Sequence, residues 1–404
     1  MRIIVTGLIA QHYTMGGVAW DYLQYFAGLH RLGHEVYYLE DSGEWPYNLD
    51  GGETGNDWVA KDCIRNIGYL RQIMQMYGME EQWAYRFPLR SEWYGLPDRK
   101  RMEIVRTADI LLNVSGTLEH PDAYRTVKKL VYIDSDPGFT QVKMRQKGSD
   151  FEKRVIQHDL HFSFGECLPD SLKDPRIDWK PTRTPIMLSE WLTSETPGAA
   201  YTTVMNWTSY KPLEFDGKIL CQKDVEFMRF LDLPGQFPRL RFEVALSRLQ
   251  HANWQTVMSS MLRQWPEDVL ALEPADMLDR FGWHVVDPQE KCNDIHSYRD
   301  YVRSSRAEWS VAKGGYVTTS PGWFSCRSAC YLAAGRPVVV QDTGFSKVFP
   351  VGEGVLPFST PEESASALEK LESDYSFHAR RAREFADAYF DSDKVLSSLI
   401  ERIS

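Results

Sequence analysis

One stretch of the sequence gathers residue types that bind a diphosphate. Ser320 to Asp342 reads as a strand end, a glycine-bearing loop, a helix that ends at Gly335, and a strand opened by a proline. The free N–H groups at such a helix start carry about half a positive charge, which suits phosphate oxygens. Arg327 adds a forked cationic donor, and Ser325 and Ser328 add hydroxyls. The alternative is a helix capped by Ser325 with a solvated Arg327.

A second group of candidate residues lies in the first half of the chain. A loop from residue 7 to 17 follows the first predicted strand, and ligands bind beyond the carboxyl ends of parallel strands. Gly16 and Gly17 allow close approach of backbone to a ligand there. Asp134 and Asp136 end another strand two residues apart, on one face. They can pair with an acceptor hydroxyl, act as a base or bind a metal; the alternative is a turn through Asp136-Pro137-Gly138.

The elements that position these residues follow an α/β pattern. Short apolar runs that alternate with helical stretches are typical of parallel strands. In the first half the predicted strands are Ile3 to Gly7, Glu35 to Asp41, Ala108 to Gly116, Leu130 to Asp136 and Leu160 to Glu166, with a helix from Val18 to Leu32. In the second half they are Tyr201 to Trp207, Arg239 to Leu246, His284 to Asp287, Tyr316 to Thr319 and Pro337 to Asp342. The predicted helices between these are Lys223 to Leu231, Trp254 to Trp265 and Tyr298 to Val311.

The domain organisation follows from length and from proline content. Single cores stop growing near about 250 to 300 residues, so 404 residues predict two domains. Five prolines between 167 and 198 exclude a long helix and mark the joining segment. We therefore predict domains at 1–198 and 199–385, with a C-terminal segment 386–404. Its helix, Asp393 to Ile403, has one apolar face and is expected to pack back on the first domain.

Composition and charge exclude several classes of protein. Hydrophobic residues make up 43% and charged residues 25%, as in folded proteins, which rules out disorder. A net charge of −10 disfavours general binding of nucleic acid or of an anionic membrane. Six cysteines without CxxC pairs indicate reduced thiols. The sequence shows no signal peptide and no spanning stretch, so we expect a soluble cytoplasmic protein without membrane insertion.

The helix followed by Ala333-Ala334-Gly335-Arg336-Pro337-Val338 resembles the donor-binding signature of GT-B glycosyltransferases. The tandem sheets, the Gly16-Gly17 pair and the helical tail resemble this superfamily over nearly the whole chain. The resemblance implies two Rossmann-like domains facing a cleft, with a nucleotide-sugar donor, UDP- or TDP-linked, on the second. The acceptor, a small molecule, glycan or protein, would bind the first. No other cofactor is expected, and no metal, because cations neutralise the leaving diphosphate.

The resemblance also implies roles for further residues. In inverting members a His or Asp near the first loop deprotonates the acceptor, so His12 and Asp21 are candidate bases. Related enzymes bind donor phosphates after the first strand of the second domain, at the position of Asn206. Lys223, at the start of the next helix, is a candidate phosphate cation, with an exposed lysine in the first turn as the alternative. Lys313 is a further candidate cation for the departing diphosphate.

One departure separates this chain from the retaining group-4 members. Those carry two Glu residues at the donor helix, and the corresponding positions here are Gly322 and Cys330. We predict that Glu308 takes the role of the second Glu, which holds the ribose; the alternative is an ordinary helix-surface Glu. The leading hypothesis is metal-independent glycosyl transfer. The alternatives are a sugar-nucleotide epimerase of the same fold and a catalytically silent binding protein.

Overall fold

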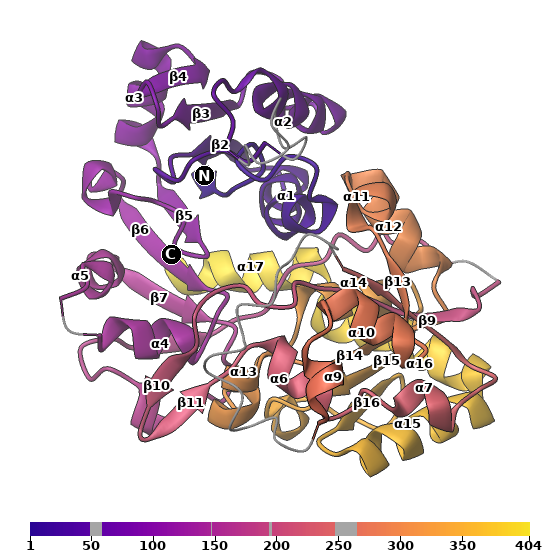
Figure 1. Ribbon diagram of the computed structural model, residues 1–404. Helices are drawn as coiled ribbons and strands as arrows, with labels where there is room; N and C mark the ends of the chain where they lie inside the picture. Colours follow the sequence, from indigo (N-terminus) through magenta and orange to yellow (C-terminus); the bar gives the residue numbers. More distant parts are fainter. Residues whose placement is uncertain (49–58, 147, 194–195, 247–264) are drawn as a thin grey trace.

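The computed structural model describes residues 1–48, 59–146, 148–193, 196–246 and 265–404. It contains two large sheets, one built from each half of the chain (Figure 1). The predicted helix Trp254 to Trp265 lies almost wholly outside these residues. None of the helices in the described ranges combines the length and apolar character needed to cross a bilayer.

The first sheet has eight strands in the order β4-β3-β2-β1-β5-β6-β7-β8. Their bounds are β1 Arg2–Thr6, β2 Glu35–Glu40, β3 Trp83–Phe87, β4 Glu92–Gly95, β5 Ile110–Val114, β6 Lys129–Asp134, β7 Leu160–Ser163 and β8 Trp179–Pro181. All neighbours are parallel except β3 and β4. The five predicted strands of this half are confirmed. Strands β3, β4 and β8 were not predicted, and β8 lies within the segment predicted to join the domains.

The second sheet has six parallel strands in the order β13-β12-β9-β14-β15-β16. Their bounds are β9 Ala200–Val204, β12 Arg241–Ala245, β13 His284–Val286, β14 Ala307–Ser310, β15 Val338–Gln341 and β16 Val355–Phe358. A small antiparallel hairpin joins β10 Leu213–Phe215 to β11 Lys218–Leu220. In both sheets the central strands are buried runs, as parallel strands covered on two faces must be.

The helices cover the sheets (Figure 1). In the first half they are α1 Gly16–Arg31, α2 Ile64–Met76, α3 Asp98–Thr107, α4 Phe139–Met144 and α5 Phe151–Ile156. In the second half they are α6 Lys223–Met228, α7 Leu233–Gln236, α9 Glu267–Leu270, α10 Pro274–Arg280, α11 Pro288–Lys291, α12 Ile295–Ser304, α13 Gly314–Thr319, α14 Cys326–Ala333, α15 Pro361–Ser373, α16 Tyr375–Tyr389 and α17 Ser392–Ile403.

Two predictions for the second half are wrong. The helix predicted from Tyr298 to Val311 ends at Ser304, because Ser305 adopts an extended conformation and β14 follows. Strand β14 lies between β9 and β15, and these long-range pairings override the local helical pattern. The strand predicted at Tyr316 to Thr319 is helix α13. Its start is sterically demanding, since a Cβ on Gly315 would lie 2.2 Å from the Phe139 ring.

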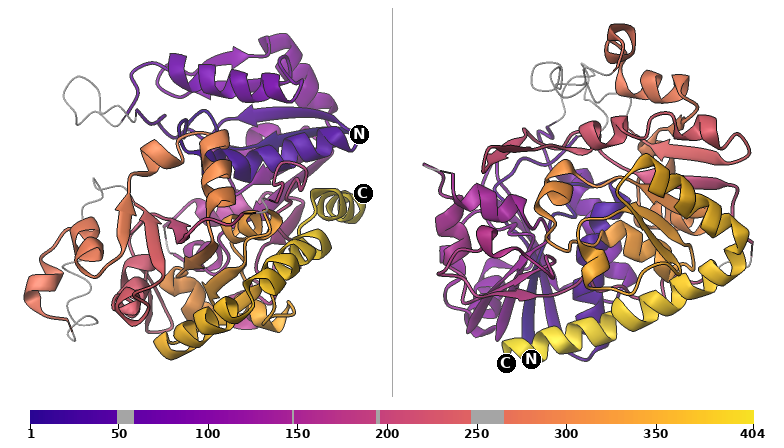
Figure 2. Two further views of the ribbon diagram at one scale, coloured as in Figure 1. Left: turned by 90° about the vertical axis from the view of Figure 1, so that its right-hand side faces the viewer. Right: turned by 90° about the horizontal axis from the view of Figure 1, so that it is seen from below.

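The last helix returns to the first half of the chain. Ser392 at its start donates its N–H to the Ile186 carbonyl at 2.9 Å, and Leu396 packs on Gly28 of α1. Arg31 of α1 pairs with Asp393, and the buried face of α17 includes Leu399. Figure 2 shows the chain end near the N-terminus. Helix α17 thus crosses back onto α1, as its apolar face predicted.

Candidate functional site

The start of helix α14 has an uncapped N-terminus. Ser325 occupies the N-cap position in an extended conformation, but its side chain makes no capping hydrogen bond. A cavity of about 20 Å³ lies at this point, lined by both helix-start residues and strand ends, among them Ser310, Phe324, Ser325, Arg327 and Ser328. The alternative in which Ser325 caps the helix is therefore not what the structure shows. The helix start faces a small cavity instead.

Arg327 is held by internal acceptors rather than by solvent. Its Nε donates to Glu308 Oε1 at 2.6 Å, and its two terminal nitrogens donate to Ser310 Oγ at 2.6 Å and to the Val204 carbonyl at 2.8 Å. Glu308 is fully buried on β14, so it is not the helix-surface residue of the alternative interpretation. Its other oxygen, Oε2, has no hydrogen-bond partner within the described part of the chain. One acceptor atom therefore remains free beside the guanidinium.

The positive charges of Arg327 and Lys313 act on Lys223. Lys223 begins α6, and its side chain takes part in no hydrogen bond or ion pair with the described residues. Burial, followed by the positive charge of Arg327, lowers the pKa of Lys223 well below its usual value, while Glu308 acts in the opposite direction. Two lysines and an arginine thus converge on one region, and one of these cations lacks an anion. A nearby anion would favour the charged form of the partly buried Lys223 amine.

Asp136 and Lys313 face each other across the two halves of the chain. Lys313 Nζ lies 3.2 Å from Asp136 Oδ1, and Tyr210 donates its hydroxyl to Asp136 Oδ2 at 2.8 Å. Tyr316 donates to Oδ1, and Lys143 Nζ lies 3.8 Å from Oδ2. Burial acts to raise the pKa of Asp136, but the charges of Lys313 and Lys143 outweigh it and hold the pKa below its usual range. An ionised carboxylate with this many donors is a poor base.

Asp134 has a structural environment that the sequence did not reveal. It is buried and accepts hydrogen bonds from Thr140 Oγ1 at 2.7 Å, Gln141 Nε2 at 2.8 Å and Ser163 Oγ at 2.9 Å. Burial raises the pKa of Asp134 although these groups donate to the carboxylate. The two aspartates therefore do not form a shared, open pair. No set of three or more His, Cys, Asp or Glu side chains placed to hold a metal occurs in the described ranges.

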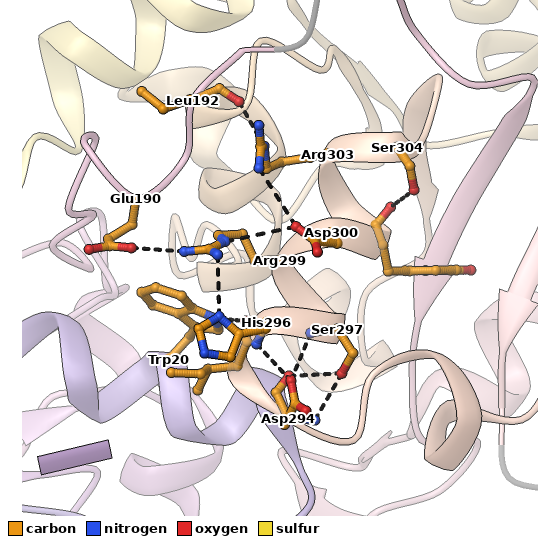
Figure 3. A network of polar contacts seen from close by, with 12 residues as sticks. Trp20, Glu190, Leu192, Asp294, His296, Ser297, Arg299, Asp300, Arg303 and Ser304 are labelled. Carbon is orange, nitrogen blue, oxygen red and sulfur yellow. Dashed lines mark hydrogen bonds and ion pairs between the residues drawn. The ribbon is translucent and has the colours of Figure 1, made fainter. Parts of the chain in front are cut away.

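Gly16 and Gly17 were predicted to lie against a ligand, but both pack against other residues of the protein. A Cβ on Gly16 would lie 2.0 Å from the Asp294 carbonyl oxygen, and one on Gly17 would lie 2.9 Å from the Tyr298 ring. The Gly16 N–H donates to the Cys292 carbonyl at 3.0 Å. The glycines thus allow α1 to approach the α11–α12 turn. Nearby, the Trp20 indole donates to the Ile295 carbonyl at 2.8 Å (Figure 3).

Asp21 points from α1 toward the start of α14. Burial raises the pKa of Asp21 to about 7, while a hydrogen bond with Cys326 and the charge of Arg327 act to lower it. The carboxylate therefore lies where the first half of the chain meets the uncapped helix. Its pKa is in the range that suits proton transfer near neutral pH.

His12 lies in the loop after β1, against residues of the first half. Its ring centroid is 4.7 Å from that of Tyr47, and its Nε2 lies 3.3 Å from Gln11 Nε2. Burial lowers the pKa of His12 to about 4, so the ring is neutral at pH 7. The loop itself is held by Glu40, which accepts from the N–H groups of Ala10 at 2.9 Å and Gln11 at 2.6 Å.

Several residues of this region escaped the sequence analysis. Asn206, which was predicted, is exposed in the turn after β9. Tyr210, Tyr316 and Lys143, which surround Asp136, were not identified as site residues. Tyr210 and Tyr316 lie 74 and 180 positions from Asp136, and no local pattern reports such pairings. The clustering of polar residues after β9 and before α13 is the one sequence feature that could have indicated these site residues.

The fold has clear counterparts among solved structures. An α-glucosyltransferase in complex with UDP and a 13-mer DNA matches with a TM-score of 0.60 at 14% identity, covering 99% of this chain and 98% of that one. Anabaena HepE in complex with UDP and glucose matches with a TM-score of 0.56 at 10% identity, covering 100% and 99%. Sucrose-phosphate synthase from Thermosynechococcus elongatus matches with a TM-score of 0.53 at 11% identity, with the same coverage.

At the level of sequence, no protein-family profile and no curated protein matches the chain. The structural matches nevertheless extend over almost the entire length of each partner, so both sheets and the returning helix are part of the likeness. The prediction of the fold is confirmed. The chain has the GT-B fold.

Proposed function

We propose that the protein transfers a sugar from a nucleotide diphosphate sugar, UDP- or TDP-linked, to an acceptor bound by the first half of the chain. The observation that carries the proposal is the unpaired Lys223 beside Arg327 and Lys313, near the uncapped start of α14. Cations and helix N–H groups fixed in place before the reaction stabilise the charge that develops on a leaving diphosphate. The solved structures of similar fold include complexes with UDP, which agrees with this assignment.

Asp21 is the best-placed base in this proposal. It reaches the start of α14 from the other half of the chain, and a pKa of about 7 suits general-base catalysis. His12, whose pKa is about 4, remains a second candidate and would be a weaker base. Asp134 and Asp136 are excluded as bases because internal donors occupy their oxygens. In the proposed site Glu308 Oε2, which has no partner among the described residues, accepts a hydrogen bond from a hydroxyl of the nucleotide sugar.

No divalent metal is part of the proposal, since Lys223, Lys313 and Arg327 supply the positive charge. Turnover should therefore persist in EDTA, and its loss with recovery on adding Mg²⁺ or Mn²⁺ would contradict this part. The acceptor stays open among small molecules, glycans and proteins. Several similar structures contain DNA, but a net charge of −10 opposes a polyanionic acceptor here.

Calorimetric titration with UDP and TDP tests the donor site. Lys223→Met removes the ammonium at similar length, and we expect nucleotide affinity to fall about 10- to 100-fold, the value of a lost charged hydrogen bond. Lys370→Met, an exposed lysine of α15 in the same half, is the matched control and should bind as wild type. Unchanged affinity in a folded Lys223→Met protein would contradict the site.

Proton uptake gives a second, independent measurement. A bound diphosphate favours the charged amine and raises the lowered pKa of Lys223, so nucleotide binding should take up a proton at pH values between the pKa of the free and of the bound protein. Titrations in buffers of different ionisation enthalpy measure this uptake, which should disappear in Lys223→Met. Product analysis with a panel of nucleotide sugars then separates transfer, seen as nucleotide release, from epimerisation, seen as isomer exchange.

A further inference from the structure

The loop after β6 is built into a cage of residues from the second half of the chain. Asp136 accepts hydrogen bonds from Tyr210, Tyr316 and Lys313, which all follow β9. The only cation that its own half contributes within the described residues is Lys143, with its Nζ 3.8 Å away. Lys313 also donates to the Tyr210 hydroxyl at 3.2 Å. One carboxylate thus joins an ammonium and two phenols across the two halves.

Aromatic packing closes this cage. Tyr316 stacks on Trp323 with ring centroids 4.1 Å apart, and the Trp323 indole donates to the Ser135 carbonyl at 3.2 Å. Phe139 packs edge-on against Tyr210 at 5.2 Å and Tyr316 at 5.3 Å. The water that would screen the Asp136–Lys313 pair is largely displaced by these rings, which strengthens the pair.

Asp134 holds the loop in this conformation. Its Oδ1 accepts from the Asp136 N–H at 3.1 Å and from Thr140 Oγ1 at 2.7 Å. Gly138 follows at a φ of +85°, a conformation that favours glycine, and a Cβ there would lie 2.6 Å from Thr319 Oγ1. The buried aspartate therefore presents Asp136 in one defined place.

Lys313 belongs at the same time to the cations of the donor site. Its charge acts on Lys223, as does that of Arg327. Like charges repel one another, and Arg327 is neutralised by Glu308 on its own half. Lys313 is neutralised by Asp136 from the other half. Without that partner Lys313 would be driven away from Lys223.

We propose that Asp136 is a positioning residue that holds the ammonium of Lys313 beside the donor phosphates and ties it to the half of the protein that binds the acceptor. The inference rests on the proposed function. Donor phosphates and acceptor are then placed relative to each other by one carboxylate, and loss of its charge should affect both donor binding and turnover. Asp136 itself does not touch the reacting atoms.

A double-mutant cycle tests the inference, with UDP binding by calorimetry and steady-state kinetics for donor. Asp136→Asn keeps the size and removes the charge, and we expect about 10-fold weaker UDP binding, a higher donor KM and a lower kcat. In a Lys313→Met background the same substitution should change UDP affinity less than 2-fold, because Asp136 acts through Lys313. Asp136→Glu, which keeps the charge, should recover part of the binding.

The outcomes separate this inference from the proposed function. Equal effects of Asp136→Asn with and without Lys313→Met would show a merely structural role and overturn it. So would unchanged binding and kinetics in Asp136→Asn while Lys223→Met has lost nucleotide affinity, a result that leaves the donor site standing. Absence of nucleotide binding in wild type would overturn the proposed function and this inference with it.

A second variant covers the case in which Asp136→Asn does not fold. Tyr316→Phe removes one donor to Asp136 without changing charge. It should raise the donor KM a few-fold in the wild-type background and leave it unchanged in Lys313→Met. An equal change in both backgrounds would again overturn the inference.

Discussion

Two of the contacts between the halves of this protein differ in kind. At the apolar contact, Gly16 and Trp20 of α1 meet α12 and the turn before it through backbone hydrogen bonds and close packing (Figure 3). At the charged contact, Asp136 meets Lys313 and two phenols. The apolar contact depends on the close fit of α1 against α12 and the turn before it. The charged contact depends on Lys313, which the proposed nucleotide-sugar donor would also contact. Binding of the donor should therefore affect this contact.

The largest expected effect on stability comes from adding a side chain that does not fit within the apolar contact. Gly16→Ala places a methyl group 2.0 Å from the Asp294 carbonyl oxygen, and backbone must move to accommodate it. We expect a loss of unfolding free energy of about 3 kcal/mol, as for overpacking in a core. Urea denaturation measures it.

Gly68→Ala is the matched control for this substitution. Gly68 lies in α2, and a Cβ there has no atom within 4 Å. The exchange should stabilise the protein by about 0.5–1 kcal/mol through helix propensity. If Gly16→Ala were as harmless as Gly68→Ala, α1 would not be in steric contact with α12.

A smaller, pH-dependent effect should come from Asp21, on α1 beside the apolar contact. Its folded pKa of about 7 exceeds the ordinary 3.8, so the folded state binds more protons between these values. Wild type should therefore lose unfolding free energy as pH rises from about 4 to 7. Three pKa units correspond to about 4 kcal/mol, and because the side chain is partly exposed we expect about 2.

Asp21→Asn isolates this effect. It lacks the titrating group, so its stability relative to wild type should increase between pH 5 and pH 8. The raised pKa of Glu40, also about 7, is common to both proteins and cancels in the difference. Denaturation at several pH values gives the comparison, and a constant difference would show that Asp21 titrates normally.

The smallest effect should come from the ion pair at the edge of the apolar contact. Glu190 lies 2.9 Å from Arg299 of α12, and both side chains are partly exposed (Figure 3). Glu190→Gln should cost about 0.5–1 kcal/mol at low salt and less at 0.5 M NaCl, because exposed pairs are weak and screened. A cost above 2 kcal/mol, unaffected by salt, would show that the apolar contact also depends on charge.

Much of the fold could be predicted because its signals are local. Parallel strands such as β1 and β6 are continuous apolar runs, and α1 and α17 show their buried faces at helical spacing. The stretch around α14 was likewise predicted as a helix between a loop and a strand, with Arg327 at its start. Each of these features depends on residues that are close in the sequence, so local sequence patterns predict them.

Tertiary structure alone decided what the site residues do. Glu308 was expected on a helix and is buried on β14, because pairing with β9 and β15 outweighs its local pattern. Asp136 is neutralised by Lys313, 177 positions away, and Gly16 packs on a carbonyl 278 positions away, at Asp294. Residue types and local spacing determined which groups were available for chemistry. Partners, burial and hence charge state depended on contacts between distant segments, which no local pattern encodes.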